Sequence, residues 1–243
     1  MKNTSMLYAG LIVAVSASVL QAQSCMNGRG GCMGSDGIAA TSAEPLSQTE
    51  QIALTDMLAE EKLAHDVYVS LAEATSLPLF TNISQAELRH QNALRQLAMR
   101  YAVKVPSTND QVGVFEDPKI QTLYDNLVEK GKQSGVEAVK VGAKIEELDI
   151  VDLREAIAAS THEDVKIVYR NLERASRNHL RAYANSIRML GGTYTSEHLS
   201  QEEFDRIANA AMEPGGRGAG MGAGRGPGRG KGWGRGNGRR QSF

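Results

Sequence analysis

Glu87-Leu88-Arg89-His90, inside the helical pattern of residues 83–97, decides the fold of this chain. Residues three apart on a helix stand on the same face, with roughly 5–6 Å between their Cβ atoms. Apolar residues fall at helical spacings from His90 in both directions, so Glu87 and His90 lie on the apolar face of the predicted helix. A carboxylate and an imidazole that face a core need a partner, and a shared metal ion is one partner that suits this spacing, although the pair alone is a weak signal.

The same residues allow a second interpretation. Ser84 and Glu87 also fit the spacing of a helix N-terminal capping box, in which the carboxylate folds back onto the backbone. The helix would then begin at Ser84, and His90 would be an ordinary half-buried histidine. The two interpretations differ in where this helix begins.

The helix before it is predicted to carry another inward carboxylate. Ser47-Gln48-Thr49-Glu50 is a capping box, and the helical pattern runs from there to about Ala74. Glu61 lies in the middle of its apolar face, and Glu60 lies at the border of that face. His65, one turn beyond Glu61, either supports the same site or is simply packed.

Two later helices also place ionisable groups on their apolar faces. A helix from about residue 134 to 149 places Glu146 among small and apolar residues, and Asp149 is within reach of the same site. Glu147 shares its stripe with basic residues and is predicted to face water. A helix that begins near residue 161 and ends at Gly191-Gly192 carries His179 near the centre of its apolar face.

These patterns predict an all-α domain over residues 46–212, a four-helix up-down bundle with crossover and accessory helices. Asp117-Pro118 opens the crossover helix, which Gly131 closes. A short amphipathic helix, about Gln201–Met212, is expected to pack on the end of the bundle.

The first 45 residues contain the features of an exported protein. Residues 1–24 have a basic start, a short apolar run and small residues, as in a cleaved signal peptide; an uncleaved membrane anchor is the alternative. Such a signal would export the protein to the periplasm or out of the cell, and no integral span is expected after cleavage. Residues 25–45 form a flexible linker. Its two cysteines, Cys25 and Cys32, cannot form a four-thiolate site, and they form a disulfide, bind a soft metal transiently or have no role.

Residues 213–243 are predicted to be a disordered basic tail. Arginines alternate with glycines around Trp233. A tract this rich in glycine cannot bury enough apolar surface to fold. Such a tract is typical of segments that bind an anionic surface or polymer through charge and stacking. A solubilising tail without a partner is the alternative.

Several runs in their order along the chain resemble a known family. They are Glu60–Ala64 with Asp66–Tyr68, Gly113–Glu116, Ile145–Ile150 and Ser176–Arg181. Together they resemble an uncharacterised prokaryotic family, a domain of unknown function within the ferritin-like superfamily, over about residues 50 to 208. The spacing of Glu61 and Tyr68 is also similar to that in the first metal-binding helix of rubrerythrins.

The resemblance implies a carboxylate-bridged site for iron or manganese, dinuclear or, with fewer ligands, mononuclear. Its metal ligands would be Glu61, Glu87, His90, Glu146 and His179. A full second Glu-x-x-His would need Glu where Ser176 stands, so that Glu60 or Asp149 would have to supply the remaining carboxylate. Tyr68 and Tyr183 would donate hydrogen bonds to the ligands.

Three hypotheses follow for the function. The first is an exported metalloprotein, a non-haem di-iron oxidase or peroxidase that oxidises Fe(II) or reduces peroxide. The second is a non-catalytic protein that binds one metal ion, or none that reacts, and is recruited to a surface by its basic tail. The third is a structural helical module with a buried polar network, and a homodimer is compatible with each of the three.

Overall fold

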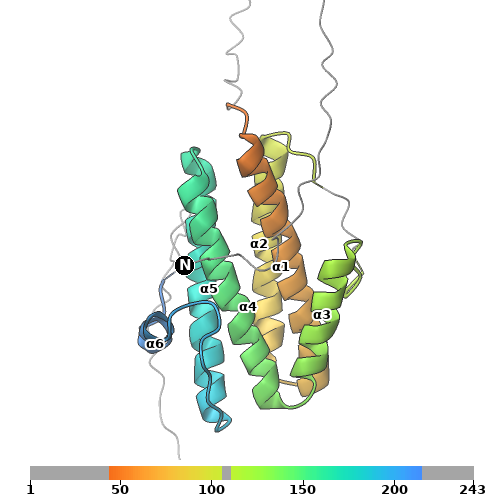
Figure 1. The fold of residues 1–243 in the computed structure, drawn as a ribbon, viewed down its shortest axis with the longest axis vertical. Coiled ribbons are helices and arrows are strands. Elements are labelled where there is room, and N and C mark those ends of the chain that lie inside the picture. Colours follow the sequence, from red (N-terminus) through yellow and green to blue (C-terminus); the bar gives the residue numbers. More distant parts are fainter. Residues whose placement is uncertain (1–43, 106–110, 215–243) are drawn as a thin grey trace, which may run out of the picture.

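The computed structural model describes residues 44–105 and 111–214, and within these ranges the chain is all-α, without a strand (Figure 1). The all-α prediction is therefore confirmed. The predicted signal peptide and nearly all of the linker and of the basic tail lie outside the described residues. The helices are α1 Gln48–Thr75, α2 Pro78–Arg100, α3 Pro118–Gly131, α4 Gly135–Ala159, α5 Glu163–Met189 and α6 Gln201–Asn209.

Helix α1 begins at the predicted capping box. The backbone N–H of Glu50 donates to the hydroxyl of Ser47 at 3.3 Å, and the Glu50 carboxylate accepts the N–H of Ser47 at 3.0 Å. Helix α3 follows its expected signals as well, because Asp117 caps it and Pro118 occupies its first turn. Local side-chain chemistry therefore fixes both helix starts.

Helix α2 begins at Pro78, one and a half turns before Ser84. The hydroxyl of Ser84 donates to the carbonyl of Thr81 at 3.0 Å, as expected for a serine inside a helix. The capping-box interpretation of Ser84 and Glu87 is therefore wrong. Glu87 and His90 lie in the helix interior, with both side chains buried.

Helix α4 is longer than predicted and ends at Ala159 rather than near Asp149. Buried apolar residues continue beyond Asp149 at helical spacings, at Ile150, Leu153 and Ala156. The helix stops at Ser160, whose hydroxyl donates to the Glu50 carboxylate at 2.8 Å. A tertiary hydrogen bond to α1, rather than a glycine or proline, marks this end.

The four long helices lie alongside one another, and α3 flanks α1 and α4 (Figure 1). Helix α1 packs mainly against α2, and α4 against α5, while contacts between α1 and α4 join the two pairs. The accessory helix α6 packs against the side of α5 rather than on the end of the bundle, and it ends at Asn209 rather than near Met212 (Figure 1). No helix in the described part of the chain has the length and apolarity needed to cross a bilayer.

Glu147 is buried, and the prediction that it faces water is wrong. One of its carboxylate oxygens accepts the Ser196 hydroxyl at 2.8 Å and the backbone N–H groups of Glu197, His198 and Leu199 at 2.7–3.0 Å. The connection between α5 and α6 folds over α4 and presents these donors to the carboxylate. Glu147 therefore anchors that connection.

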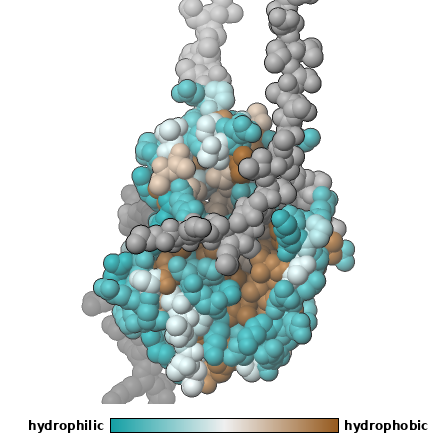
Figure 2. All heavy atoms as spheres, in the orientation of Figure 1, coloured by the Kyte–Doolittle hydropathy of each residue, from teal (hydrophilic) through white to brown (hydrophobic). Residues whose placement is uncertain are grey.

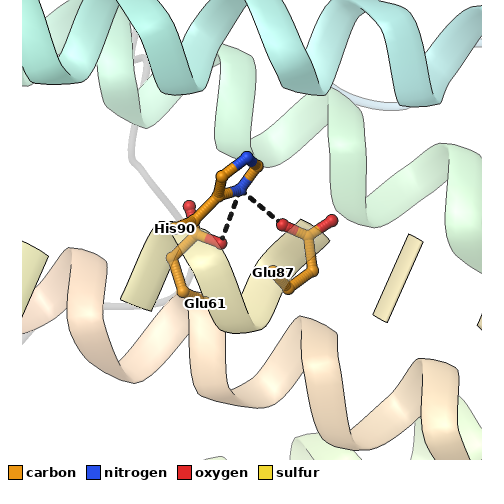
Figure 3. A group of neighbouring side chains, drawn as sticks. All are labelled: Glu61, Glu87 and His90. Carbon is orange, nitrogen blue, oxygen red and sulfur yellow. Dashed lines mark hydrogen bonds and ion pairs between the residues drawn. The ribbon is translucent and has the colours of Figure 1, made fainter. Parts of the chain in front are cut away.

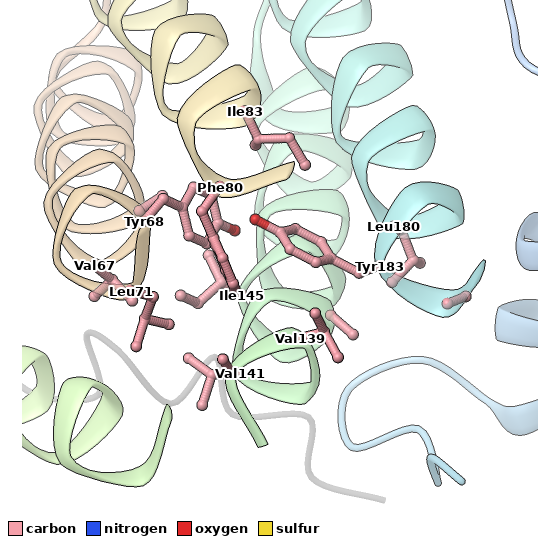
Figure 4. Packing of buried hydrophobic residues seen from close by; sticks show 14 of the residues in the cluster. Val67, Tyr68, Leu71, Phe80, Ile83, Val139, Val141, Ile145, Leu180 and Tyr183 are labelled. Carbon is pink, nitrogen blue, oxygen red and sulfur yellow. The ribbon is translucent and has the colours of Figure 1, made fainter. Parts of the chain in front are cut away.

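The apolar core consists of two clusters stacked along the bundle. One contains the aromatic group of Tyr68, Phe80 and Tyr183, whose ring centroids lie 5.5–6.0 Å apart (Figure 4). Gly142 makes room for this group, because a Cβ at that position would lie 2.4 Å from the Tyr183 ring. The other cluster includes Leu58 and Leu94 from α1 and α2. Buried ionisable side chains lie between the two clusters.

Candidate metal centre

The polar layer between the two clusters contains all five predicted ligands. Each side chain comes from the interior of a long helix: α1 supplies one, α2 two, α4 one and α5 one. Their exposed fractions are small, and that of Glu146 is 0%. The residues are Glu61, Glu87, His90, Glu146 and His179.

One half of the centre joins α1 to α2. The Nδ1 atom of His90 lies 2.6 Å from Oε2 of Glu87 and 3.2 Å from Oε2 of Glu61. Figure 3 shows this nitrogen facing both carboxylates, with a dashed line to each. One ligand atom from each of the three residues fits within a group whose members lie within 4.8 Å of one another.

The other half joins α2 to α4 and α5. The Nδ1 atom of His179 lies 3.0 Å from Oε1 of Glu87 and 3.4 Å from Oε1 of Glu146. Ligand atoms of these three residues form a second group of the same size. The hydroxyl of Tyr68 donates to Oε1 of Glu146 at 2.8 Å and holds that carboxylate in place.

Glu87 belongs to both halves. Its Oε2 faces His90 and its Oε1 faces His179, while the two imidazole rings stack with centroids 5.7 Å apart. A carboxylate that turns one oxygen to each of two histidine-containing groups has the arrangement of a bridging ligand.

Several ligand atoms in this layer make no hydrogen bond. They include Oε1 of Glu87 and Nδ1 of His179, although these two atoms lie only 3.0 Å apart, and Oε2 of Glu146. Buried polar atoms are costly to leave unpaired. Glu87 and His179 nevertheless form an ion pair. Metal–ligand bond lengths of about 2.0–2.2 Å, as in zinc sites, put neighbouring ligand atoms about 3 Å apart, so the 3.0 Å between these two atoms also suits two ligands of one ion.

The charges in the layer are strongly coupled. Burial alone would raise the pKa of Glu87, but the positive charges of His179 and His90 outweigh it and hold the pKa below its ordinary value. Burial raises the pKa of Glu61 and of Glu146 despite the neighbouring histidines. Without a metal, the negative charge of Glu87 therefore lies between His90 and His179 and stabilises the protonated form of both histidines.

Residues 50–211 of the chain match the family described as "Uncharacterized protein domain (DUF2202)". The chain belongs to this family. It is 44% identical over 172 residues to "Uncharacterized protein MJ0754" of Methanocaldococcus jannaschii, a match that covers 71% of this chain and 93% of that protein. The crystal structure of hypothetical protein MJ0754 from Methanococcus jannaschii DSM 2661 is similar, with a TM-score of 0.68 and 42% identity over 72% of this chain and 100% of that one. The predicted membership in an uncharacterised family is confirmed.

The remaining candidates of this DUF2202 chain lie around the five. Tyr183 packs on Tyr68, and burial followed by the charge of Glu146 raises the pKa of its hydroxyl. Ser176 is buried, but its hydroxyl donates to the carbonyl of Leu172 at 3.2 Å. The position at which a fourth carboxylate was expected is thus occupied by a small residue bonded to its own helix.

Glu60, Asp149 and His65 lie outside both ligand groups of the DUF2202 centre. His65 contacts Asp66, with 2.8 Å between Nδ1 and Oδ1, so its role is packing and pairing. Glu60 and Asp149 are buried and line a cavity beside the centre. Two further acids, Asp56 and Asp152, accompany Glu60 in a second cavity. The sequence analysis missed these two, although each lies three or four residues from a candidate that it named.

Proposed function

We propose that this chain is a ferritin-like metalloprotein in which Glu61, Glu87, His90, Glu146 and His179 hold two iron or manganese ions. The observation that carries the proposal is the position of Glu87, with one carboxylate oxygen toward each histidine. Carboxylates and imidazoles together suit iron and manganese, whereas the described residues include no cysteine that would favour a softer metal.

The helical arrangement supports the ferritin-like assignment. Bundles of that class build metal sites from inward Glu residues and Glu-x-x-His pairs on facing helices. Here α2 carries the pair Glu87 and His90, while α1 and α4 each contribute one Glu to the two ligand groups. The long connection from α2 through α3 to α4 takes the place of a crossover.

The surrounding residues suit a reactive metal. Bound iron or manganese would supply one-electron redox chemistry, which fits Fe(II) oxidation or peroxide reduction. Tyr68 orients Glu146 through its hydroxyl, and the cluster of Tyr68, Phe80 and Tyr183 keeps bulk water from one side of the layer.

A non-catalytic metal-binding protein is the second candidate, and Ser176 favours it. With a serine bonded to its own helix at that position, the half of the centre around His179 contains Glu146 and the shared Glu87 as its carboxylates. Each half thus contains two carboxylates and one histidine and lacks a further carboxylate, and a single ion in either half would leave a protein that binds metal without turnover.

Metal content tests both candidates. We would purify the full chain free of metal, reconstitute it anaerobically with Fe(II), and measure iron per chain by elemental analysis. The comparison is with the double variant Glu87→Ala/His90→Ala and with Glu73→Gln, an exposed α1 carboxylate. Two ions in the wild type and in Glu73→Gln, and none in the double variant, would support the dinuclear proposal. One ion would favour the second candidate, and a wild type without iron would overturn both.

A further inference from the structure

Two cavities meet at Glu60 on the α1 side of the candidate centre. The first has a volume of about 200 Å³ and lies between α1 and α4. Four carboxylates line it, from Asp56, Glu60, Asp152 and Glu155, and the other lining residues are alanines and Met57. We call it the acidic cavity. Its lining attracts cations and would repel anions.

The second cavity is apolar. It has a volume of about 260 Å³ and lies between α1, α3 and α4, where leucines and Ile145 form most of its walls. Figure 2 shows an apolar strip over the region of α3 and α4, bordered by hydrophilic residues. Glu60 and Asp149 are its two acidic residues, and Lys144, which is bound to Glu197 at 2.6 Å, also lines it. Because Glu197 neutralises Lys144 and most of the walls are apolar, this side offers a cation few ligands beyond Glu60 and Asp149, whereas the acidic cavity offers four carboxylates.

Glu60 is the residue that the two cavities share. Its side chain is buried, with 7% of the residue exposed, and its Oε2 atom makes no hydrogen bond. An unpaired carboxylate oxygen in a buried position is costly and calls for a positive partner. Burial raises the pKa of Glu60, as do the negative charges of Asp152, Asp56 and Glu61, so the acids of this cavity interact with one another.

Helix geometry connects Glu60 to the candidate centre. Helices α1 and α4 are packed together and run in opposite directions (Figure 1). Going away from the centre, α1 presents Glu61, Glu60 and Asp56, and α4 presents Glu146, Asp149 and Asp152. At 1.5 Å per residue, these two series rise about 8 and about 9 Å toward the same end of the bundle.

Asp149 is a buried carboxylate whose charge interacts with the carboxylates of the centre. It lines the apolar cavity beside Glu60 and lies three residues from Glu146 on α4. Burial raises its pKa, and the charges of Glu146, Glu61, Glu87 and Glu60 raise it further. The negative potential at Asp149 therefore comes both from the carboxylates of the centre and from Glu60.

We propose that Glu60 and Asp149 form a transit site for a divalent cation, which enters through the acidic cavity and passes to the candidate centre. The inference rests on the proposed function, because it names the path by which that centre is filled. Two carboxylates offer the oxygen ligands that Fe(II) and Mn(II) accept. They lack the imidazoles of the centre, so the ion is held here less tightly and moves on.

The test is the rate at which metal-free full-length protein takes up Mn(II). Rapid-freeze electron paramagnetic resonance counts the free aqueous Mn(II) that remains at each time after mixing. We expect Glu60→Gln and Asp149→Asn each to slow uptake about tenfold, which is about 1.4 kcal/mol in the barrier, and to bind as many ions at equilibrium as the wild type. Glu73→Gln, which removes an exposed charge from the same helix, should load at the wild-type rate.

The other outcomes separate this inference from the proposed function. A wild type that binds Mn(II) and variants that load at its rate would overturn the transit site and leave the centre intact. A variant that binds fewer ions at equilibrium would make Glu60 or Asp149 a ligand of the centre, which also overturns the transit role. An equally slow Glu73→Gln would show a general effect of net charge. A wild type that binds no Mn(II) would overturn the proposed function and the inference together.

Discussion

Because Glu87 is shared by two ligand groups, neutralising single carboxylates should have unequal effects on metal binding. Glu61 belongs only to the group of His90, and Glu146 only to the group of His179. Glu61→Gln or Glu146→Gln should therefore remove one ion and leave the other. Glu87→Gln should weaken both, because each group loses its common carboxylate.

The size of the effect can be worked out for thermal stability. An ion that binds only the folded state stabilises it by RT ln(1 + [M]/Kd), which is about 2.7 kcal/mol at a Mn(II) concentration one hundred times the Kd. For a domain of this size, each kcal/mol raises the Tm by about 2–4 °C. Two ions together contribute about 5.4 kcal/mol, so we expect Mn(II) to raise the Tm of the wild type by about 10–20 °C. With one ion left, the Tm of Glu61→Gln or Glu146→Gln should rise by about half as much, and that of Glu87→Gln by almost nothing.

Scanning calorimetry with and without Mn(II), together with metal analysis of the same samples, measures the pattern. Glu73→Gln on the exposed side of α1 serves as the matched control and should behave as the wild type. A Glu87→Gln variant that retains the full Tm shift would refute the bridging role. Equal losses in all three ligand variants would refute the division into two groups and indicate a single ion bound by the whole layer.

Three further predictions concern parts of the fold away from the centre. Glu147→Ala removes four hydrogen bonds and leaves backbone N–H groups without their partner, so urea denaturation should show a loss of about 2–4 kcal/mol; an unchanged midpoint would contradict the anchoring role. Gly142→Ala places a Cβ 2.4 Å from the ring of Tyr183 and should cost about 1–3 kcal/mol of thermal stability, and a Tm at or above the wild-type value would refute the close packing. Hydrogen bonds from His162 and its neighbours outweigh burial and lower the pKa of Glu50, and the bond to Glu50 raises the pKa of His162. The stabilisation of the fold by ionised Glu50 is thus lost as the pH falls below about 4.5, and that by protonated His162 is lost as the pH rises above about 6.5. The difference in unfolding free energy between wild type and Glu50→Gln should therefore be largest between these two pH values. A difference that does not vary with pH would exclude the pairing.

The parts of the fold that the sequence predicts well are those with a local cause. A capping box starts α1, Asp117 and Pro118 start α3, and Gly191 lies just beyond the end of α5. The inward direction of the five candidate ligands is local as well, because helical spacing alone sets which side of a helix a residue occupies. The structure then brings together five side chains from four helices that the sequence could only place on four separate faces.

The features that the sequence analysis missed depend on partners far along the chain. Glu147 is buried because the backbone N–H groups of residues 197–199 reach it, and backbone donors have no signature in the sequence. Helix α4 ends at Ala159, and the next residue, Ser160, donates a hydrogen bond to a carboxylate 110 positions earlier. Glu147 was predicted to face water from the pattern of its own helix, and no local pattern indicated Ser160, because another segment sets the environment of both residues.

The polar layer itself argues against a purely structural role. Buried ionic groups stabilise a fold only where their geometry is good and their remaining atoms are paired, and well-packed apolar residues often do as well or better. Here the layer separates two apolar clusters and leaves ligand atoms of Glu87, Glu146 and His179 without a hydrogen bond. Glu87 and His179 form an ion pair at 3.0 Å, but a network that served stability alone would also bond Oε2 of Glu146, for example to a hydroxyl such as that of Ser176, which instead bonds to its own helix. A cation held between the carboxylates and the imidazoles would satisfy the same atoms at once, and this is the reason to look for the function of the chain in that layer.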